Sequence, residues 1–373
     1  MDVVELAKEL IDIHSETLND GEVNVAKYLA DFLEDLGFSP ELIRFNSNNA
    51  NVIASVGSGE GLMLNGHMDT VPWGDPSLWE HGTSAAVVGD KLYGRGASDM
   101  KGGLASMLAA VANLDIARKN PKRRLLITLV AREEVDFRGS TYLLDNRSEI
   151  FKGVKYGMIA EPTFSNSEMR MQVAQKGAMN IEMKFKGKAA HASRPWLGDN
   201  AILKAVKFIE EYQKLAEGFS VSDELLGKGT INIGVISGGT APNVVPDFCK
   251  LNVDRRLVPG ETVKGALDQV RSVLAKLGIS ADISTPVARE AFRVEKSSKI
   301  LEMVRRAAGG SIKEFGSTGY TEAELYKAKA GIDSVVFGPG ELEMAHQANE
   351  YVPIESLKKA EHVYENLLNE WCI

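Results

Sequence analysis

Short apolar runs of strand length alternate with helical patterns through the first and last thirds of this chain. The runs are rich in Val, Ile, Leu and Met and lie at 52–56, 62–65, 125–130, 156–159 and 334–337. Helical spacing of apolar residues occurs at 23–36 and 104–117. Strands that are apolar throughout are typical of a sheet covered by helices on both faces. We therefore predict an α/β domain with a buried, largely parallel sheet.

The middle of the chain has a different pattern. From 181 to 186 apolar residues alternate with charged ones, which indicates a strand with one face in water. The elements predicted after it are helix 200–215, strands 230–236 and 248–253, helix 263–277 and strand 280–284. This β-α-β-β-α-β order is ferredoxin-like. We predict an α+β domain at 177–286, inserted into a domain formed by residues 1–176 and 287–373.

Charge and composition narrow the classes of partner. With 43 basic and 51 acidic residues the net charge is −8, and no long basic run offers a surface for nucleic acid or an anionic membrane. The apolar runs are too short to span a bilayer. The N-terminal residues lack the features of a signal peptide, and two distant cysteines, Cys249 and Cys372, form no disulfide framework. We expect a cytoplasmic protein that acts on small molecules.

A histidine and an aspartate follow the second apolar run. His67 and Asp69 stand in the segment GHMDTVP, after the strand LMLN. In extended backbone, residues two apart point the same way, so the imidazole and the carboxylate can cooperate. An aspartate commonly holds the second ring nitrogen of a metal-bound histidine. The alternative is an ordinary polar turn after a strand.

Further acidic residues and a histidine stand at or near the ends of other predicted elements. They are Glu133 and Glu134 after 125–130, Glu161 after 156–159, Asp99 before the helix at 104–117, and His346 after 334–337. Ligands bind at strand ends in α/β sheets. Taken alone, Asp99 could equally be a helix N-cap. Together these nitrogen and oxygen donors suit two divalent, zinc-like ions bridged by one carboxylate, with a spare carboxylate as general base.

The segments GHMDTVP, GRGASDMKGG, AREE, AEP, HAS and GPG…AH occur in this order over nearly the whole chain. In this the chain resembles the co-catalytic zinc amidohydrolases and peptidases that include acetylornithine deacetylase and succinyl-diaminopimelate desuccinylase. The resemblance implies a zinc-peptidase-like sheet with an inserted lid and dimerisation domain. It also implies two divalent metals, zinc or else cobalt or manganese. One would be held by His67, Asp99 and Glu161, the other by Asp99, Glu134 and His346.

The same resemblance assigns further roles. It makes Asp99 the bridging ligand, Asp69 the residue that orients His67, and Glu133 the general base. It also implies a cis peptide bond after Asp99. In the inserted domain it implies that His191 steadies the oxyanion in a partner subunit's site within a homodimer.

Two further residues of the inserted domain are implied as substrate contacts. Asn243 would contact the substrate amide, and Arg256 would bind its α-carboxylate. The adjacent Arg255 is an alternative for that guanidinium, because either residue could be the inward one on a strand.

The expected reaction is hydrolysis of an N-acyl amide on a small amino acid. In the loop 316–324 the tripeptide Thr-Glu-Ala resembles the acetylornithine deacetylase branch, and no Arg follows Arg306. A cationic side chain of the substrate could pair with Glu322 or Glu324, although both could instead lie on the polar face of a helix at 322–328. Alternatives are a desuccinylase, a dipeptidase or carboxypeptidase, and a metal-poor binding protein without activity.

Overall fold

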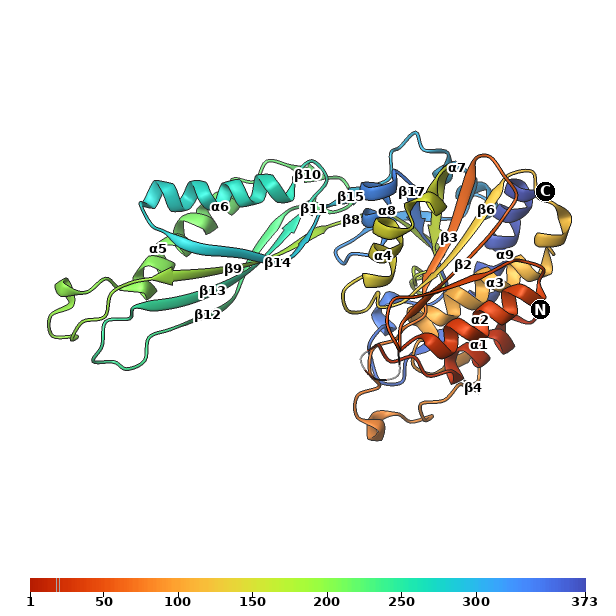
Figure 1. The fold of residues 1–373 in the computed structure, drawn as a ribbon, viewed down its shortest axis with the longest axis horizontal. Helices are drawn as coiled ribbons and strands as arrows, with labels where there is room; N and C mark the ends of the chain where they lie inside the picture. Colours follow the sequence, from red (N-terminus) through yellow and green to blue (C-terminus); the bar gives the residue numbers. More distant parts are fainter. Residues whose placement is uncertain (18, 20) are drawn as a thin grey trace. The chain divides into compact units, whose positions relative to one another are not determined.

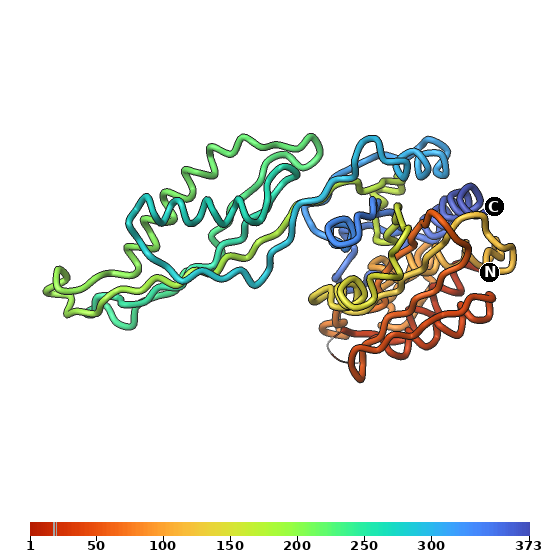
Figure 2. Tube along the Cα trace, turned by 45° about the horizontal axis from the view of Figure 1, so that its top comes forward, coloured from red at the N-terminus to blue at the C-terminus, as the bar shows by residue number. Residues whose placement is uncertain are grey.

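The structure is a computed structural model that describes residues 1–17, 19 and 21–373. Contacts divide the chain into two compact units, which are described separately (Figure 1). Unit 1 contains Met1–Val173, Val294–Phe315 and Leu325–Ile373, and unit 2 contains Ala174–Arg293 and Gly316–Glu324. Both ends of the chain therefore build unit 1, as the red and blue segments in Figure 2 show. The sequence had placed 316–324 with the first domain, whereas its contacts are with unit 2.

Unit 1 is built on a mixed sheet with the strand order β1-β2-β6-β3-β7-β17-β8, and β16 pairs with β8. Its strands are β1 (Glu41–Arg44), β2 (Ala50–Val56), β3 (Gly61–His67), β6 (Arg124–Val130), β7 (Val154–Ile159), β8 (Arg170–Gln175), β16 (Lys313–Ser317) and β17 (Asp333–Val336). The central strands β6, β3, β7 and β17 run parallel. All seven residues of β3 are buried, which explains why its sequence does not alternate. The predicted α/β class is confirmed.

Helices cover both faces of this sheet. A side chain at Gly66 of β3 would meet Leu104 of α3 (Gly102–Asn113). The neighbouring Asn65 instead accepts a hydrogen bond from Tyr326 of α8 (Ala323–Ala330). Since adjacent strand residues point to opposite faces, α3 and α8 lie on opposite sides of the sheet. The other helices of unit 1 are α1 (Val3–Asp12), α2 (Val23–Asp35), α4 (Arg138–Asn146), α7 (Lys299–Ala307) and α9 (Ile354–Cys372).

Helix α3 is the central helix of its layer. It packs between α1 and α9, which come from opposite ends of the chain. Ten of its twelve residues are buried, which is why its sequence reads as an almost continuous apolar run. A small antiparallel sheet of β4 (Ala86–Val88), β5 (Lys91–Tyr93) and β18 (Tyr351–Pro353) adjoins the segment before α3. The strands of this small sheet were not predicted, because each has only three residues.

Unit 2 has the predicted ferredoxin-like order. Its antiparallel sheet is arranged β12-β13-β9-β14. The elements are β9 (Gly177–Lys186), α5 (Ala201–Glu217), β12 (Thr230–Gly238), β13 (Phe248–Leu257), α6 (Val263–Leu277) and β14 (Ala281–Arg289). Helices α5 and α6 lie together on one face (Figure 1). Their core includes Phe185, Phe208 and Tyr212. The short strands β10 (Ser222–Asp223), β11 (Gly227–Lys228) and β15 (Phe292–Arg293) complete this unit.

Within the described part of the chain, every helix is too short or too polar to cross a lipid bilayer.

Candidate metal centre

Parallel strands bring the predicted ligands to one edge of the sheet. His67 is the last residue of β3 and lies opposite Val130, the last residue of β6. Glu133 and Glu134 follow β6, and Glu161 follows β7, which is parallel to β3. Because the carboxyl ends of parallel strands meet at one edge, side chains distant in sequence become neighbours.

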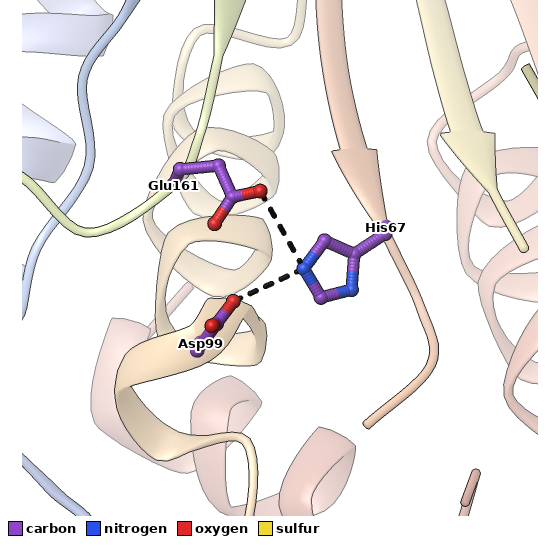
Figure 3. A group of neighbouring side chains, drawn as sticks. All are labelled: His67, Asp99 and Glu161. Carbon is purple, nitrogen blue, oxygen red and sulfur yellow. Dashed lines mark hydrogen bonds and ion pairs between the residues drawn. The ribbon is translucent and has the colours of Figure 1, made fainter. Parts of the chain in front are cut away.

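The first group of side chains is His67, Asp99 and Glu161 (Figure 3). The His67 Nε2 atom lies 3.1 Å from Asp99 Oδ1 and 3.6 Å from Glu161 Oε1. All three residues are buried. One imidazole nitrogen and two carboxylates thus point at a common position from three different segments of the fold.

The second group is Asp99, Glu134 and His346. The His346 Nε2 atom lies 2.9 Å from Glu134 Oε2 and 3.4 Å from Asp99 Oδ2. The His346 side chain is about half exposed, so this group borders solvent. Asp99 therefore belongs to both groups, with Oδ1 directed to His67 and Oδ2 directed to His346.

Asp99 lies in the segment 97–101 that leads into α3. The residue at the N-cap of α3 is Lys101, so the alternative that Asp99 caps this helix is wrong. The peptide bond between Asp99 and Met100 is cis, as expected from the resemblance.

Asp69 holds more of the site than the sequence indicated. The Nδ1 atom of His67 lies 3.0 Å from the backbone oxygen of Asp69 and 3.6 Å from its Oδ1. The carboxylate itself accepts hydrogen bonds from the backbone N–H groups of Glu133 and Glu134, at 3.1 Å each. The carbonyl of Asp69 is thus the nearer partner of the imidazole, while the carboxylate orders the turn that carries both glutamates.

The crowding of acidic groups shifts their pKa values. Burial, and next the charge of Asp99, raises the pKa of Glu161 well above its ordinary value. Burial alone would lower the pKa of His67, but carboxylates, Glu161 foremost, raise it well above the usual range. Hydrogen bonds that the His346 imidazole donates to Asp99 and then to Glu134 raise the pKa of His346 to about 10. These directions reflect an excess of negative charge, which divalent cations would neutralise.

The donor set therefore fits two divalent metal ions. Each group offers one imidazole nitrogen and two carboxylates, as catalytic zinc sites do. Among the described residues, Glu133 joins neither group, although it is adjacent to Glu134. It is buried at 9% exposure, and its N–H is tied to Asp69. A carboxylate beside the ligands is what a general base requires.

Two of the predicted substrate residues of unit 2, His191 and Asn243, lie on neighbouring loops. His191 is exposed, and its Nδ1 lies 2.8 Å from Ser193 Oγ. The Ala192 N–H donates to the backbone oxygen of Asn243 at 3.0 Å, so the two loops lie side by side. A hollow of about 570 Å³ adjoins them, lined by Ala192, Thr240, Pro242 and nearby residues. His191 and Asn243 thus share one surface of unit 2.

The structure separates the two adjacent arginines. The Arg255 side chain is fully buried, bonded to Glu261 and stacked at 4.1 Å on the Phe219 ring. Arg256 bonds to Asp254 at 2.8 Å and keeps about a third of its side chain exposed. Only Arg256 of this pair is accessible to a ligand. Strand alternation places the two on opposite faces of β13.

Glu322 and Glu324 do not lie on an exposed face. Glu322 is 1% exposed and Glu324 is 9% exposed, so the alternative of a solvated helix face is wrong. Helix α8 begins at Ala323, close to the predicted start.

Two further carboxylates, Glu22 and Glu350, are buried and were not predicted from the sequence. Glu350 stands four residues after His346, which is the only local signal for it.

The sequence pattern of the family described as "Peptidase family M20/M25/M40" matches residues 63–370. The chain belongs to this family and is an amidohydrolase of metallopeptidase type. It is 29% identical to a probable succinyl-diaminopimelate desuccinylase of Staphylococcus aureus, over 94% of this chain and 92% of that relative. It is 31% identical to acetylornithine deacetylase of Myxococcus xanthus, over 91% and 90% of the two chains.

Solved structures show the same fold. Aminopeptidase PepT from Bacillus cereus aligns with a TM-score of 0.79 at 24% identity, covering 99% of this chain and 98% of that one. The Bacillus subtilis YXEP protein, a dinuclear metal-binding peptidase from the M20 family, aligns with a TM-score of 0.71 at 16% identity, covering 98% and 96%. The family and the fold agree with the resemblance seen in the sequence.

Proposed function

We propose that this protein hydrolyses the amide bond of an N-acylated small amino acid at a centre of two divalent metal ions, with zinc as the metal. One observation carries the proposal: Asp99 directs one carboxylate oxygen to each of the two ligand groups. That arrangement suits a bridging ligand between two ions. A protein that only bound its ligand would not need Glu133 beside such a centre.

The proposed ligands divide between two ions. His67 and Glu161 complete one site and Glu134 and His346 the other, with Asp99 common to both. When bound, such ions polarise the scissile carbonyl and make a nearby water acidic enough to react near neutral pH. Asp69 keeps His67 and the turn 133–134 in place through its carbonyl and its carboxylate.

The proton transfers are assigned to Glu133. Its carboxylate takes a proton from the attacking water and passes it to the amine that leaves. The neighbouring Glu134 cannot share this role while its oxygens face His346. The turn that Asp69 holds thereby gives two adjacent glutamates different tasks.

Unit 2 would supply the substrate contacts. His191 would donate to the oxyanion, Asn243 to the substrate amide, and Arg256 to the α-carboxylate. Arg256 suits this role because it is accessible, whereas Arg255 is buried against Glu261.

We also propose a homodimer formed through unit 2. Strand β12 is an edge strand that exposes Val235 and Ile236, and exposed apolar edges favour strand pairing between chains. Such pairing would extend the four-stranded sheet across a two-fold axis.

For the substrate we propose an N-acetyl basic amino acid such as acetylornithine. The Thr-Glu-Ala tripeptide of the loop 316–324 resembles the acetylornithine deacetylase branch, and the loop holds no Lys or Arg that could pair with an acidic acyl group. The relative of 31% identity, an acetylornithine deacetylase, is consistent with this choice.

Succinyl-diaminopimelate is the second candidate, because a relative of 29% identity is a probable desuccinylase. Comparing kcat/KM for the two substrates tests the choice. A preference of tenfold or more for the succinylated compound would overturn it and leave the metal centre unaffected.

Two adjacent substitutions test the assignment of the glutamates. Glu133→Gln is expected to lower kcat by about 10²- to 10⁴-fold, because it removes proton transfer. It is expected to retain the full metal content of the wild type. Glu134→Gln is expected to lose metal, measured by elemental analysis after dialysis. The assignment is contradicted if Glu133→Gln loses metal and Glu134→Gln keeps it.

A further inference from the structure

Glu350 is a buried carboxylate outside both ligand groups, and four donors surround it. Its Oε1 atom accepts from the backbone N–H groups of Ser98 and Asp99, at 2.9 Å each. Its Oε2 atom accepts from the Gly96 N–H at 2.9 Å and from Arg95 Nη1 at 2.7 Å. The residue is 1% exposed. Every donor comes from one short segment, 95–99, which ends at the proposed bridging ligand.

The backbone around Glu350 is tied to the same segment. Its carbonyl oxygen accepts from the Gly94 N–H at 3.0 Å. Directly after it, β18 pairs with β5 and places Tyr351 opposite Tyr93. Both the start of the segment and Glu350 are therefore held by one small sheet. The segment 94–99 wraps around a single side chain that is 251 residues from Asp99 in sequence.

This geometry has a chemical reason. Glycine at 96 has φ of 85°, a conformation in which the backbone can turn its N–H groups inward. Successive inward N–H groups form a concave site for an anion, and here a carboxylate of the chain itself fills it. Asp99 must direct its two oxygens to two different groups, and any rotation of its backbone would turn one of them away.

We infer that Glu350 is a positioning residue that fixes the backbone of Asp99 so that its carboxylate reaches both metal sites. The inference rests on the proposed function, in that Asp99 is taken as the bridging ligand. Glu350 contributes no ligand atom, and it acts through the segment 94–99. The same stretch of chain, 346–350, would thus supply one ligand, His346, and the support for another.

The test substitution is Glu350→Gln, which nearly preserves side-chain volume. A glutamine has one acceptor oxygen and one NH₂ group, so that one pair of donors on the segment would face another donor. Glu350→Asp keeps both acceptors but shortens the side chain by one methylene. Glu350→Asp replaces Glu350→Gln in the measurements below if the glutamine variant fails to fold. Leu367→Ala, a core truncation in α9, serves as the control for lost stability.

Two measurements apply to these variants. Hydrogen exchange of the metal-free protein is expected to show the amides of 96, 98 and 99 exchanging at least tenfold faster in Glu350→Gln. Titration with Co²⁺ or Zn²⁺ alone is expected to show affinity about 10- to 100-fold weaker, as for other residues that support metal ligands. Glu350→Asp should lie between the wild type and Glu350→Gln in both. Leu367→Ala should lower Tm and bind metal like the wild type.

Unchanged exchange at 96–99 and unchanged metal affinity in folded Glu350 variants would overturn the inference. The inference would also be overturned if Leu367→Ala showed the same faster exchange at 96–99 and the same weaker metal binding at a matched loss of Tm. A wild type that binds no metal would contradict the proposed function instead. The exchange measurement in metal-free protein separates that failure from a failure of the role assigned to Glu350.

Discussion

Asp69 shows how one side chain can serve several residues of a site. Its carbonyl meets the His67 imidazole, and its carboxylate accepts from two successive N–H groups at 133 and 134. These N–H groups belong to Glu133 and Glu134, which are proposed as general base and metal ligand respectively. Donors of this kind are what a buried carboxylate requires, because each hydrogen bond offsets part of the cost of taking its oxygens out of water.

Glu22 is a buried carboxylate of another kind. It accepts from Asn49 and from the Arg132 N–H, at the start of the turn that carries Glu133 and Glu134. Burial, and next the charge of Asp69, raises its pKa from 4.5 to about 7. The folded state therefore favours protonated Glu22. The stability gained from that proton is fully present below the unfolded pKa of 4.5 and is lost as pH rises through about 7.

The raised pKa of Glu22 predicts how stability depends on pH when wild type is compared with Glu22→Gln, whose side chain stays neutral at every pH. Relative to this variant, the metal-free wild type is expected to lose roughly 3 kcal/mol of unfolding free energy between about pH 4.5 and 8. Urea unfolding across that range measures the difference. Glu217→Gln, at an exposed site in α5, should show no such trend. A constant offset between wild type and Glu22→Gln would disprove the raised pKa.

At the scale of elements, the site depends on how closely α3 approaches the end of β7. A Cβ atom at Gly103 would lie 1.8 Å from the Ala160 carbonyl oxygen, which directly precedes Glu161. The helix that follows Asp99 and the strand that leads to Glu161 are therefore in backbone contact at this glycine. Only a residue without a side chain permits that spacing, which brings two ligands of the first group together.

Gly103→Ala is therefore expected to be disruptive although alanine favours helices. The added methyl group must displace backbone, which should cost ~3 kcal/mol or more of unfolding free energy. It should also weaken metal binding by moving Glu161. Thermal unfolding and metal titration measure both effects. Gly265→Ala, at an exposed helical position in α6, is the matched control and should leave Tm and metal affinity nearly unchanged. Normal stability of Gly103→Ala would refute the close contact.

At the scale of the whole molecule, the proposed dimer depends on the two edges of the sheet in unit 2. These edges are β12 and β14. Val235 on β12 is 51% exposed, and Val287 on β14 is 36% exposed. Val235→Lys puts a charged side chain on the exposed apolar edge that would form the pairing, so we expect monomers in light scattering coupled to size exclusion. Val287→Lys should remain dimeric. The β12 interface is excluded if Val235→Lys stays dimeric as well.

Mixing two inactive variants tests whether subunits share sites. Glu133→Gln and His191→Ala, exchanged in equal amounts, should recover about a quarter of wild-type activity. About half of the dimers become mixed, and each mixed dimer has one complete site out of two. No recovery after verified subunit exchange would place His191 at the site of its own chain.

Both fold patterns, and the His, Asp and Glu residues near the strand ends, can be recognised from the sequence. The spacing of apolar residues indicates which side of each element is buried. It therefore predicts both the strand-length apolar runs and the change to alternation near 178. The residues that lie around Asp99 in the structure could be predicted from the sequence, because each follows or adjoins a recognisable element.

Packing between elements, in contrast, sets which of two adjacent residues of the same type is buried and which is accessible. It buries Arg255 and leaves Arg256 accessible, and it places Glu134, rather than Glu133, beside His346, as the family resemblance implied. It also brought Glu350 to Asp99 across 251 residues. Such contacts are formed by packing between distant elements, and local sequence carries no record of them because a buried glutamate and a solvated one look the same in a sequence.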